Sequence, residues 1–422
     1  MAALACGGSG DVTGGPDGGA NGQTDGGGGP GGDDFVRYPS DARHSPITPA
    51  LAAHLAAIAG GEPAVFAKVG DSITVAGSFL RCFASADTTD LAGHGELTAT
   101  LDAFRAGDAA GSTPFDRESA AAGIGWNAGT VLAGSPSPLA SEIDAIHPGY
   151  AVVMYGTNDV GFENPAWYGQ NLATVVDQLI AAGAVPVLSS IPPRDDDAGV
   201  DALVPLHNTI ARGIAEARQI PFMDFHGALL PLAGHGLGPD GVHPNTAPGG
   251  GCSLTADGLG YGYNVRNLLA LEGLDRARRA VAGEAPDTAG LAPLAGDGTS
   301  ADPIAIDALP FNHAADTSGS AQRELDVYDG CAAGADEGGP EIIYRLELAE
   351  PTTVHLVVID DDAVDVDLHL LRGDTTTAAC VERNDREIRR TLEAGTWFIA
   401  VDSYVAAGAE QAGAYFLAAV AE

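Results

Sequence analysis

Four short, continuously apolar runs constrain the fold of this chain more than any other feature of its sequence. Strands buried on both faces, as in a parallel sheet covered by helices, lack the alternation of polar and apolar residues that half-buried strands show. Between the runs, apolar residues recur at spacings of three or four, which is typical of helices. The sequence therefore predicts an α/β unit in which helices cover a mainly parallel sheet. The expected strands are Pro63–Gly70, Tyr150–Gly156, Ala184–Ser190 and Ile220–His226, and the helical positions include Leu172, Val175, Val176, Leu179 and Ile180, then Leu203, Leu206, Ile210 and Ile214.

The pattern changes near residue 283. A last helix, expected over roughly Leu254–Val281 and partly broken by GLGYGY, closes an α/β domain of residues 35–282. Residues 283–301 are rich in Gly, Pro and Ala and show no periodicity, which is typical of a linker. In residues 302–422 apolar side chains alternate with period two between acidic or glycine-rich turns, which predicts an antiparallel, all-β sandwich. One shared face holds Ile342, Tyr344, Leu346 and Leu348, and another holds Val354, Leu356 and Val358.

Residues 1–34 have a composition that does not favour folding. From residue 7 onward they are nearly all Gly, Asp, Pro, Asn, Gln, Ser and Thr, so they bury too little apolar surface to offset chain entropy. We expect a disordered tether. The first ten residues, MAALACGGSG, resemble the end of a lipoprotein signal peptide, with Cys6 as the residue that receives lipid. We therefore expect an exported, lipid-anchored protein; a small-residue N-terminus without targeting meaning is the alternative.

The charge balance excludes some classes of partner. The chain carries 57 acidic and 20 basic residues, a formal net charge of −37, and Lys68 is its only lysine. Such a surface repels the phosphates of nucleic acids and of anionic membranes, and it keeps a protein soluble. The sequence contains no apolar run of about 18 residues, the length that spans a bilayer. We expect a monomer that binds a small substrate and no nucleic acid.

The cysteines fall in pairs by region. If Cys6 carries lipid, four remain: Cys82 and Cys252 in the first half, Cys331 and Cys380 in the second. Even pairing within each half suits an oxidising compartment, so we expect two disulfides. Sequence alone does not fix the connectivity, and scattered free thiols are the alternative.

A serine follows the first apolar run. The stretch Ala64–Leu80 passes from the expected strand through Gly-Asp-Ser into a helical pattern. Ligands of an open parallel sheet bind beyond the carboxyl ends of its strands, and a helix N-terminus there offers unpaired amide donors. Ser72 is thus placed as a nucleophile would be. A turn with an ordinary helix cap is the alternative.

Two later loops add polar groups at the same edge. The loop YGTNDVG carries Gly156 and Asn158, and the side-chain amide of Asn158 could donate to a developing oxyanion. In LGPDGVHPN, Asp240 and His243 stand three apart, so the carboxylate can face the imidazole and fix its tautomer. Turn capping and a solvated acidic turn are the ordinary alternatives.

Taken together and in order, these three blocks resemble the SGNH/GDSL hydrolase superfamily across roughly Ala64–Val281. The first block reads GDSI where the family motif has leucine. The resemblance implies a flavodoxin-like three-layer α/β/α fold and ester hydrolysis without a cofactor. It also implies Ser72 as nucleophile, His243 as base and Asp240 as the residue that supports the base.

The resemblance further implies an oxyanion hole. Its donors would be the Ser72 backbone N–H, a glycine N–H and the Asn158 side chain. We favour Gly125 as the glycine, because its distance to Leu132 resembles the start of the family's helix. The alternative is that the local glycines only permit close packing. The segment SAAAGIGWNAGTVL offers Gly123, Gly125 and Gly129.

Other imidazoles compete with His243 for the role of base. His207 lies within a helical pattern and is expected to be structural, and His226 ends an apolar run. His235 lacks a following acid at a suitable spacing, which weakens its case.

The C-terminal part has its own resemblance. The segments GPEIIYRLEL, VDVDLHLL, LEAGTWFIAVDSY and AGAYFLAAV look like the bacterial pre-peptidase C-terminal domain over residues 302–422. This implies an accessory role, such as binding or stabilising. Its acidic cluster could chelate calcium through carboxylate oxygens, and a solvated acidic face is the alternative. The cluster consists of Asp360, Asp361, Asp362, Asp365 and Asp367, with Asp402.

The sequence thus favours an exported serine esterase that acts on carboxylic esters such as O-acetylated carbohydrate or other short-chain acyl esters. Expected compartments are a bacterial periplasm, an outer-membrane surface or the extracellular space. Two alternatives stay open: a lipase-like or lysophospholipase activity, and a non-catalytic surface protein that binds or adheres.

Overall fold

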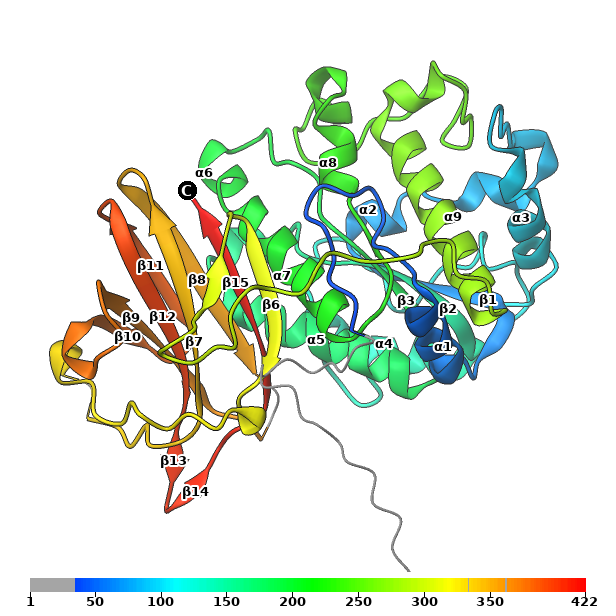
Figure 1. Cartoon of the computed structure of the whole chain (residues 1–422). Helices are drawn as coiled ribbons and strands as arrows, with labels where there is room; N and C mark the ends of the chain where they lie inside the picture. The colour runs from blue at the N-terminus through cyan, green and yellow to red at the C-terminus, as the bar shows by residue number, and fades with distance from the viewer. Residues whose placement is uncertain (1–34, 333, 361–362) are drawn as a thin grey trace, which may run out of the picture.

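The computed structural model describes residues 35–332, 334–360 and 363–422. Figure 1 shows two units side by side, an α/β unit and a β-sandwich. The predicted tether with Cys6 lies outside the described residues, as do Asp361 and Asp362. Within the described ranges, no helix has both the length and the apolar character needed to cross a bilayer.

A four-stranded parallel sheet forms the centre of the first unit. Its strands lie in the order β1-β2-β3-β4, and each pair is parallel. Every residue of β2 and β3 is buried, which explains why these runs are continuously apolar. The predicted parallel sheet is therefore confirmed. The strands are β1 (Glu62–Gly70), β2 (Pro148–Met154), β3 (Val185–Ser189) and β4 (Phe222–Met223).

The fourth strand is shorter than predicted. The chain leaves the sheet after Met223, because Asp224 caps the short helix α8 (Phe225–Leu229) by accepting the N–H of Gly227. The last helix also begins later than predicted, as α9 (Gly262–Val281). The glycine-rich residues before it form loops and a 3₁₀ turn, which fits the low helix propensity of glycine.

Helices cover both faces of this sheet. The helices α4, α5 and α7 connect successive parallel strands, and right-handed crossovers place such helices on one face. On the other face, α9 contacts α1 and α3 as well as the strands. The three-layer α/β/α arrangement is thus present. Bounds are α1 (Pro49–Ile58), α3 (Thr98–Arg105), α4 (Pro138–Ile146), α5 (Pro165–Ala181) and α7 (Val204–Ala217).

Strand β1 lies at the edge of the sheet. In the flavodoxin-like strand order, 2-1-3-4-5, the first strand has a neighbour on each side, so another strand would pair with the free side of β1. In the part of the chain that the structure describes, an isolated parallel bridge between Gly70 and Ala122 occupies that place, and no strand does. The segment that leads to Gly123 and Gly125 therefore passes beside the carboxyl end of β1.

The second unit is a sandwich of two sheets. One has the order β10-β9-β12-β7-β5 and the other β11-β8-β15-β6, with β13 and β14 as a separate hairpin. All pairs are antiparallel except β5 with β7. The strands are β5 (Ile304–Ile306), β6 (Phe311–Asp316), β7 (Glu341–Leu348), β8 (Thr352–Asp360), β9 (Val366–Arg372), β10 (Cys380–Asn384), β11 (Glu387–Leu392), β12 (Gly395–Ser403), β13 (Val405–Ala406), β14 (Ala409–Glu410) and β15 (Ala414–Ala421).

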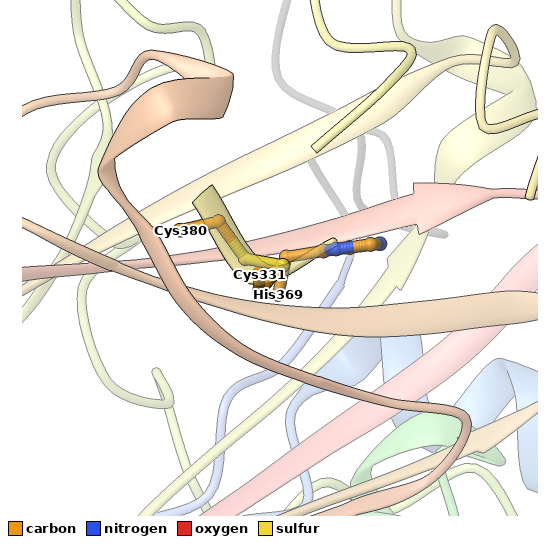
Figure 2. A group of neighbouring side chains, drawn as sticks. All are labelled: Cys331, His369 and Cys380. Carbon is orange, nitrogen blue, oxygen red and sulfur yellow. A yellow bond between two sulfur atoms is a disulfide. The ribbon is translucent and has the colours of Figure 1, made fainter. Parts of the chain in front are cut away.

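Both predicted disulfides are present. Cys82 and Cys252 join the 3₁₀ turn Arg81–Ala84 to the loop that follows His243, with their Cα atoms 5.7 Å apart. Cys331 and Cys380 join two segments of the sandwich, 5.2 Å apart at Cα. Figure 2 shows the second disulfide with the buried side chain of His369 beside it.

The outer face of one sandwich sheet packs against the helices. Along β8, Val354, Leu356 and Val358 enter the sandwich core as predicted, whereas Val357 and Ile359 join the hydrophobic core of the α/β unit. The helices come close because α5 and α7 present glycines. A Cβ at Gly169 would lie 2.6 Å from Cδ1 of Ile359, and one at Gly213 would lie 3.0 Å from Cδ2 of Phe416. The two units therefore share one continuous core.

Replacing Gly169 with leucine should weaken this junction. The new side chain gains helix propensity of about 1 kcal/mol relative to glycine but meets Ile359, and overpacking of this kind costs about 1–3 kcal/mol. We expect a lower midpoint in urea unfolding than for Thr174→Leu, an exposed position on the same helix. Equal midpoints for the two variants would contradict the close packing described here.

Candidate active site

The Gly-Asp-Ser block turns the end of β1 into the single-turn helix α2 (Ser72–Val75). Asp71, not Ser72, caps this helix: its carboxylate accepts the N–H of Ile73 at 2.9 Å, and its carbonyl accepts those of Thr74 and Val75. Burial raises the pKa of Asp71, and the charge of Arg266 opposes that shift. Because Asp71 makes the cap, the hydroxyl of Ser72 is available to other partners.

The structure brings Ser72, His243 and Asp240 together in a chain of hydrogen bonds. Ser72 Oγ lies 2.8 Å from His243 Nε2, and His243 Nδ1 lies 2.8 Å from Asp240 Oδ2. The other Asp240 oxygen accepts the backbone N–H groups of Val242 and His243, at 3.1 and 3.0 Å. Both carboxylate oxygens are thus engaged. This arrangement allows the imidazole to accept the serine proton.

The pair of His243 and Asp240 lies at the protein surface, with side chains 42% and 54% exposed. Partial burial tends to raise the pKa of Asp240. The N–H groups of Val242 and His243, together with the imidazole, outweigh that effect, so the pKa of Asp240 lies below its ordinary value. Asp240 is therefore an anion at neutral pH.

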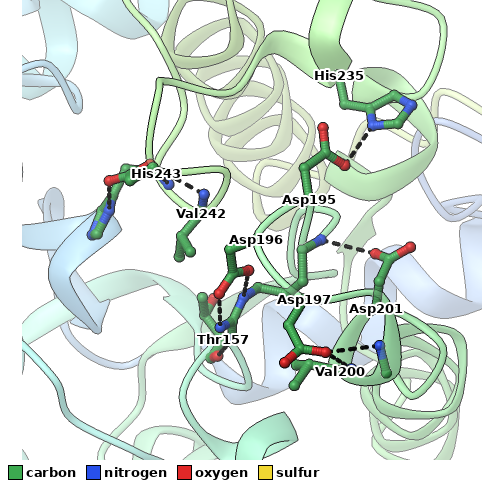
Figure 3. Close-up of polar contacts among 12 residues, drawn as sticks. Thr157, Asp195, Asp196, Asp197, Val200, Asp201, His235, Val242 and His243 are labelled. Carbon is green, nitrogen blue, oxygen red and sulfur yellow. Dashed lines mark hydrogen bonds and ion pairs between the residues drawn. The ribbon is translucent and has the colours of Figure 1, made fainter.

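An acidic loop after β3 supports the loop that carries His243 (Figure 3). Arg194 donates to the carbonyl of Thr157 at 2.6 Å and to both oxygens of Asp196, at 2.8 and 2.9 Å. Gly241 lies so close that a Cβ would be 2.7 Å from the Asp196 nitrogen, and its φ of +69° also favours glycine. Loops that follow three different strands are thereby fixed to one another.

A second imidazole–carboxylate pair lies nearby. His235 Nδ1 is 2.8 Å from Asp195 Oδ1, as Figure 3 shows. The acid precedes the histidine by 40 residues, so a search for a following acid could not find it. His207 bonds the carbonyl of Leu203, and burial lowers the pKa of His207 to about 4, which fits its predicted structural role. Among the described residues, only the imidazole of His243 bonds Ser72.

The predicted oxyanion donors lie on adjacent loops. Asn158 donates one side-chain N–H to the Trp126 carbonyl at 2.8 Å, which holds the turn that contains Gly125 and leaves the second N–H of that amide. The N–H of Gly123 is used, since it donates to Gly70. Gly125 is exposed, with φ +74°. Its role, like that of Asn158, stays a prediction.

Arg266 is a residue that the sequence analysis missed. It extends from α9 and donates to the Ile73 carbonyl at 2.7 Å and to the Thr74 hydroxyl at 2.8 Å. Its guanidinium lies 3.8 Å from the centre of the Phe79 ring, and burial lowers its pKa to about 10. This buried cation therefore holds the helix that presents Ser72. An arginine amid the buried positions of a helix is the one sequence signal that could have pointed to it.

The residues proposed to bind calcium are only partly described, because Asp361 and Asp362 lie outside the described ranges. Asp360 pairs with Arg386 at 3.6 Å, and Asp367 pairs with Arg383. Asp402 accepts the hydroxyl of Tyr328 at 2.6 Å. The carboxylates of Asp360, Asp367 and Asp402 thus have partners other than a metal, and the calcium site, with Asp365, stays a prediction.

Part of the chain matches the sequence model of a known protein family. Residues 69–247 match the sequence model of the GDSL-like Lipase/Acylhydrolase family, and no curated protein matches. Among solved structures, the chain is similar to a GDSL-like lipase from Bacteroides thetaiotaomicron, at 16% identity and a TM-score of 0.31, over 54% of this chain and 99% of that one. A catalytic mutant of an acetylxylan esterase from Geobacillus stearothermophilus gives 15% identity and 0.33, over 51% and 94%. The pre-peptidase C-terminal domain of a Bacillus anthracis collagenase gives 11% and 0.18, over 28% and 91%.

The two surface histidines should differ in their effect on the reactivity of Ser72. His243→Ala removes the imidazole that is placed to accept the serine proton, so phosphorylation of Ser72 by diisopropyl fluorophosphate, with loss of fluoride, should slow by about 100-fold or more. His235→Ala should change that rate less than threefold. Mass spectrometry of the labelled peptide over time measures both rates. If His235→Ala slowed the labelling more than His243→Ala does, the assignment of His243 as the base would be wrong.

Arg266→Met should misplace the helix that presents Ser72. It leaves the buried Thr74 hydroxyl without its partner and leaves the Ile73 carbonyl with only the longer bond from the Tyr263 hydroxyl, at 3.4 Å. A buried polar group left unpaired costs about 1–3 kcal/mol. We expect a lower melting temperature and slower labelling of Ser72 at a temperature where the variant is folded. Arg276→Met, on the same helix but bonded to Ser45 and Asp287, should lower stability without slowing the labelling.

Proposed function

Because residues 69–247 belong to the GDSL-like lipase/acylhydrolase family, we propose that this chain hydrolyses carboxylic esters through Ser72, His243 and Asp240. The observation that carries the proposal is the pair of 2.8 Å contacts that link these side chains from loops after different strands. A nucleophile, a base and an orienting carboxylate in hydrogen-bond reach are the requirements of serine catalysis.

The reaction would proceed in two halves. His243 Nε2 accepts the proton of Ser72 as Oγ attacks the acyl carbon, while Asp240 holds Nδ1–H and stabilises the imidazolium. The tetrahedral intermediate then collapses, and His243 returns the proton to the leaving alkoxide. A water molecule attacks the resulting acyl-enzyme by the same route and releases the acid.

Three N–H groups would bind the oxyanion of each intermediate. They are the backbone N–H groups of Ser72 and Gly125 and the second side-chain N–H of Asn158. Asn158 already bonds Trp126 next to Gly125, so one side chain supports the turn and contributes a donor. Donors fixed before the reaction stabilise the developing charge without reorganisation.

We propose short acyl esters of polar alcohols, such as O-acetylated sugars, as substrates. The solvent-facing carboxylates of Asp195 and Asp240, close to His243, suit a hydroxyl-rich alcohol better than a long acyl chain. Two disulfides favour an oxidising compartment outside the cytoplasm.

A lipase-like activity is the second candidate, and a specific feature favours it. Ile124 and Phe162 lie on the loops that carry Gly125 and Asn158, and they are 78% and 61% exposed. Apolar side chains at the rim of an ester site can receive a longer acyl chain. Hydrolysis rates on 4-nitrophenyl esters whose acyl chains have two to ten carbons distinguish the candidates. If the lipase-like activity applies, Ile124→Ser and Phe162→Ser should slow hydrolysis of only the longer esters.

Ser72→Ala should lower turnover of 4-nitrophenyl acetate by about 1,000-fold or more, and Asn158→Ala by about 100-fold or more, corresponding to about 3 kcal/mol. Ser78→Ala serves as control, because its half-buried hydroxyl bonds only Thr246. Equal rates for the wild type and Ser72→Ala would reject the proposed esterase function and favour the alternative of a non-catalytic binding protein.

A further inference from the structure

A cavity of about 310 Å³ adjoins the nucleophile helix at the free edge of β1. Thr74 and Val75 of α2 line it, and so does Ala122, the bridge partner of Gly70. Ala122 stands three residues before Gly125. The cavity therefore lies between the helix that presents Ser72 and the segment that leads to the predicted oxyanion turn.

The cavity gathers positive charge in a strongly acidic chain. Lys68, Arg81 and Arg117 line it, although the chain has 20 basic against 57 acidic residues. Lys68, the only lysine of the chain, is 5% exposed. Burial of the only ammonium side chain at a cavity wall points to a role in binding rather than in solubility.

Lys68 has no acidic partner of its own. Its ammonium donates to the Phe115 carbonyl at 2.8 Å, and among the described residues no carboxylate lies within ion-pair distance of it. An ammonium has three donors, so two remain after that bond. Burial lowers the pKa of Lys68 to about 8, and Arg81 adds to the shift, while Asp116, Glu142 and Glu118 oppose it. A buried ammonium of this kind is stabilised by an anion placed against it.

The two arginines differ in how firmly they are neutralised. Arg117 bonds both oxygens of the fully buried Glu142, at 3.1 and 2.9 Å, so its charge is matched. Within the described part of the chain, the acidic side chain that pairs with Arg81 is Glu118, at 3.2 Å, and the two side chains are 40% and 84% exposed. Ion pairs between exposed side chains are weak, because solvent screens them. An incoming anion can thus replace Glu118 as the partner of Arg81.

We propose that this cavity binds a carboxylate on the alcohol part of the ester, so that the chain acts on acylated acidic sugars such as O-acetylated hexuronic acids. The inference rests on the esterase function proposed above and names its substrate class. Lys68 and Arg81 hold the carboxylate by charge-assisted hydrogen bonds, and Glu118 competes with it. The volume lies at the lower end of that of small-molecule sites, which suits one sugar-sized group.

Two acetylated sugars that differ only in the carboxylate test the proposal. Acetate release from O-acetylated glucuronic acid should exceed that from O-acetylated glucose by about tenfold in kcat/KM. Arg81→Gln and Lys68→Met should each remove this preference, whereas Glu118→Gln should increase it. Arg279→Gln is the matched control, because Arg279 does not line the cavity: it lies in the last turn of α9, is 43% exposed and pairs with Glu284. Equal rates on the two sugars, or shifts in one direction for Arg81→Gln and Glu118→Gln, would overturn the proposal.

Direct binding separates this inference from the esterase function. Calorimetric titration of Ser72→Ala with glucuronate, glucose and inorganic phosphate needs no turnover. Glucuronate should bind at least tenfold more tightly than glucose, and Arg81→Gln, a surface change that leaves the core intact, should abolish the difference. Absence of glucuronate binding, or tighter binding of phosphate, would reject the carboxylate site even if 4-nitrophenyl acetate is hydrolysed. Glucuronate binding without any ester hydrolysis would support the anion site and reject the enzyme.

Discussion

Parallel pairing of β1, β2 and β3 is the constraint on which the candidate site depends. Parallel strands end at the same edge of a sheet, so Ser72 after β1, Asn158 after β2 and the acidic loop after β3 converge although they are far apart in the chain. The loop with His243 reaches that edge through Gly241, which packs against Asp196. The position of the candidate site therefore follows from strand pairing in the core. The side chains at this edge of the sheet meet because the loops that carry them have suitable lengths.

Buried charged side chains stabilise the helix that presents Ser72. Asp71 caps the N-terminus of α2, and Arg266 of α9 donates to Ile73 and Thr74 in the middle of that helix. Such a short helix has little stability by itself, because helix nucleation is unfavourable. The surrounding side chains thus supply the rigidity that a longer helix would otherwise provide.

The sequence predicted what depends on local patterns. The apolar runs predicted the sheet, the period of two predicted the sandwich, and the cysteine positions predicted both disulfides. Boundaries failed where a capping side chain or a group of glycines decided them, as at Asp224 and before Gly262. The contacts of Arg266 with α2 and of His235 with Asp195 join residues far apart in the chain, and no local pattern records them. Val357 and Ile359 on the outer face of β8 are apolar in the sequence, but the sequence does not show that this face packs against the helices of the α/β unit.

The shared core changes how the second unit should be regarded. Because Ile359 and Phe416 lie against α5 and α7, the sandwich is not a tethered module that searches space independently of the α/β unit. A protease that cut within residues 283–301 would leave both fragments associated, since separation would expose apolar surface on each to water. Whatever surface the sandwich recognises, docking there would hold the rim with Ser72 at a fixed orientation and height above it.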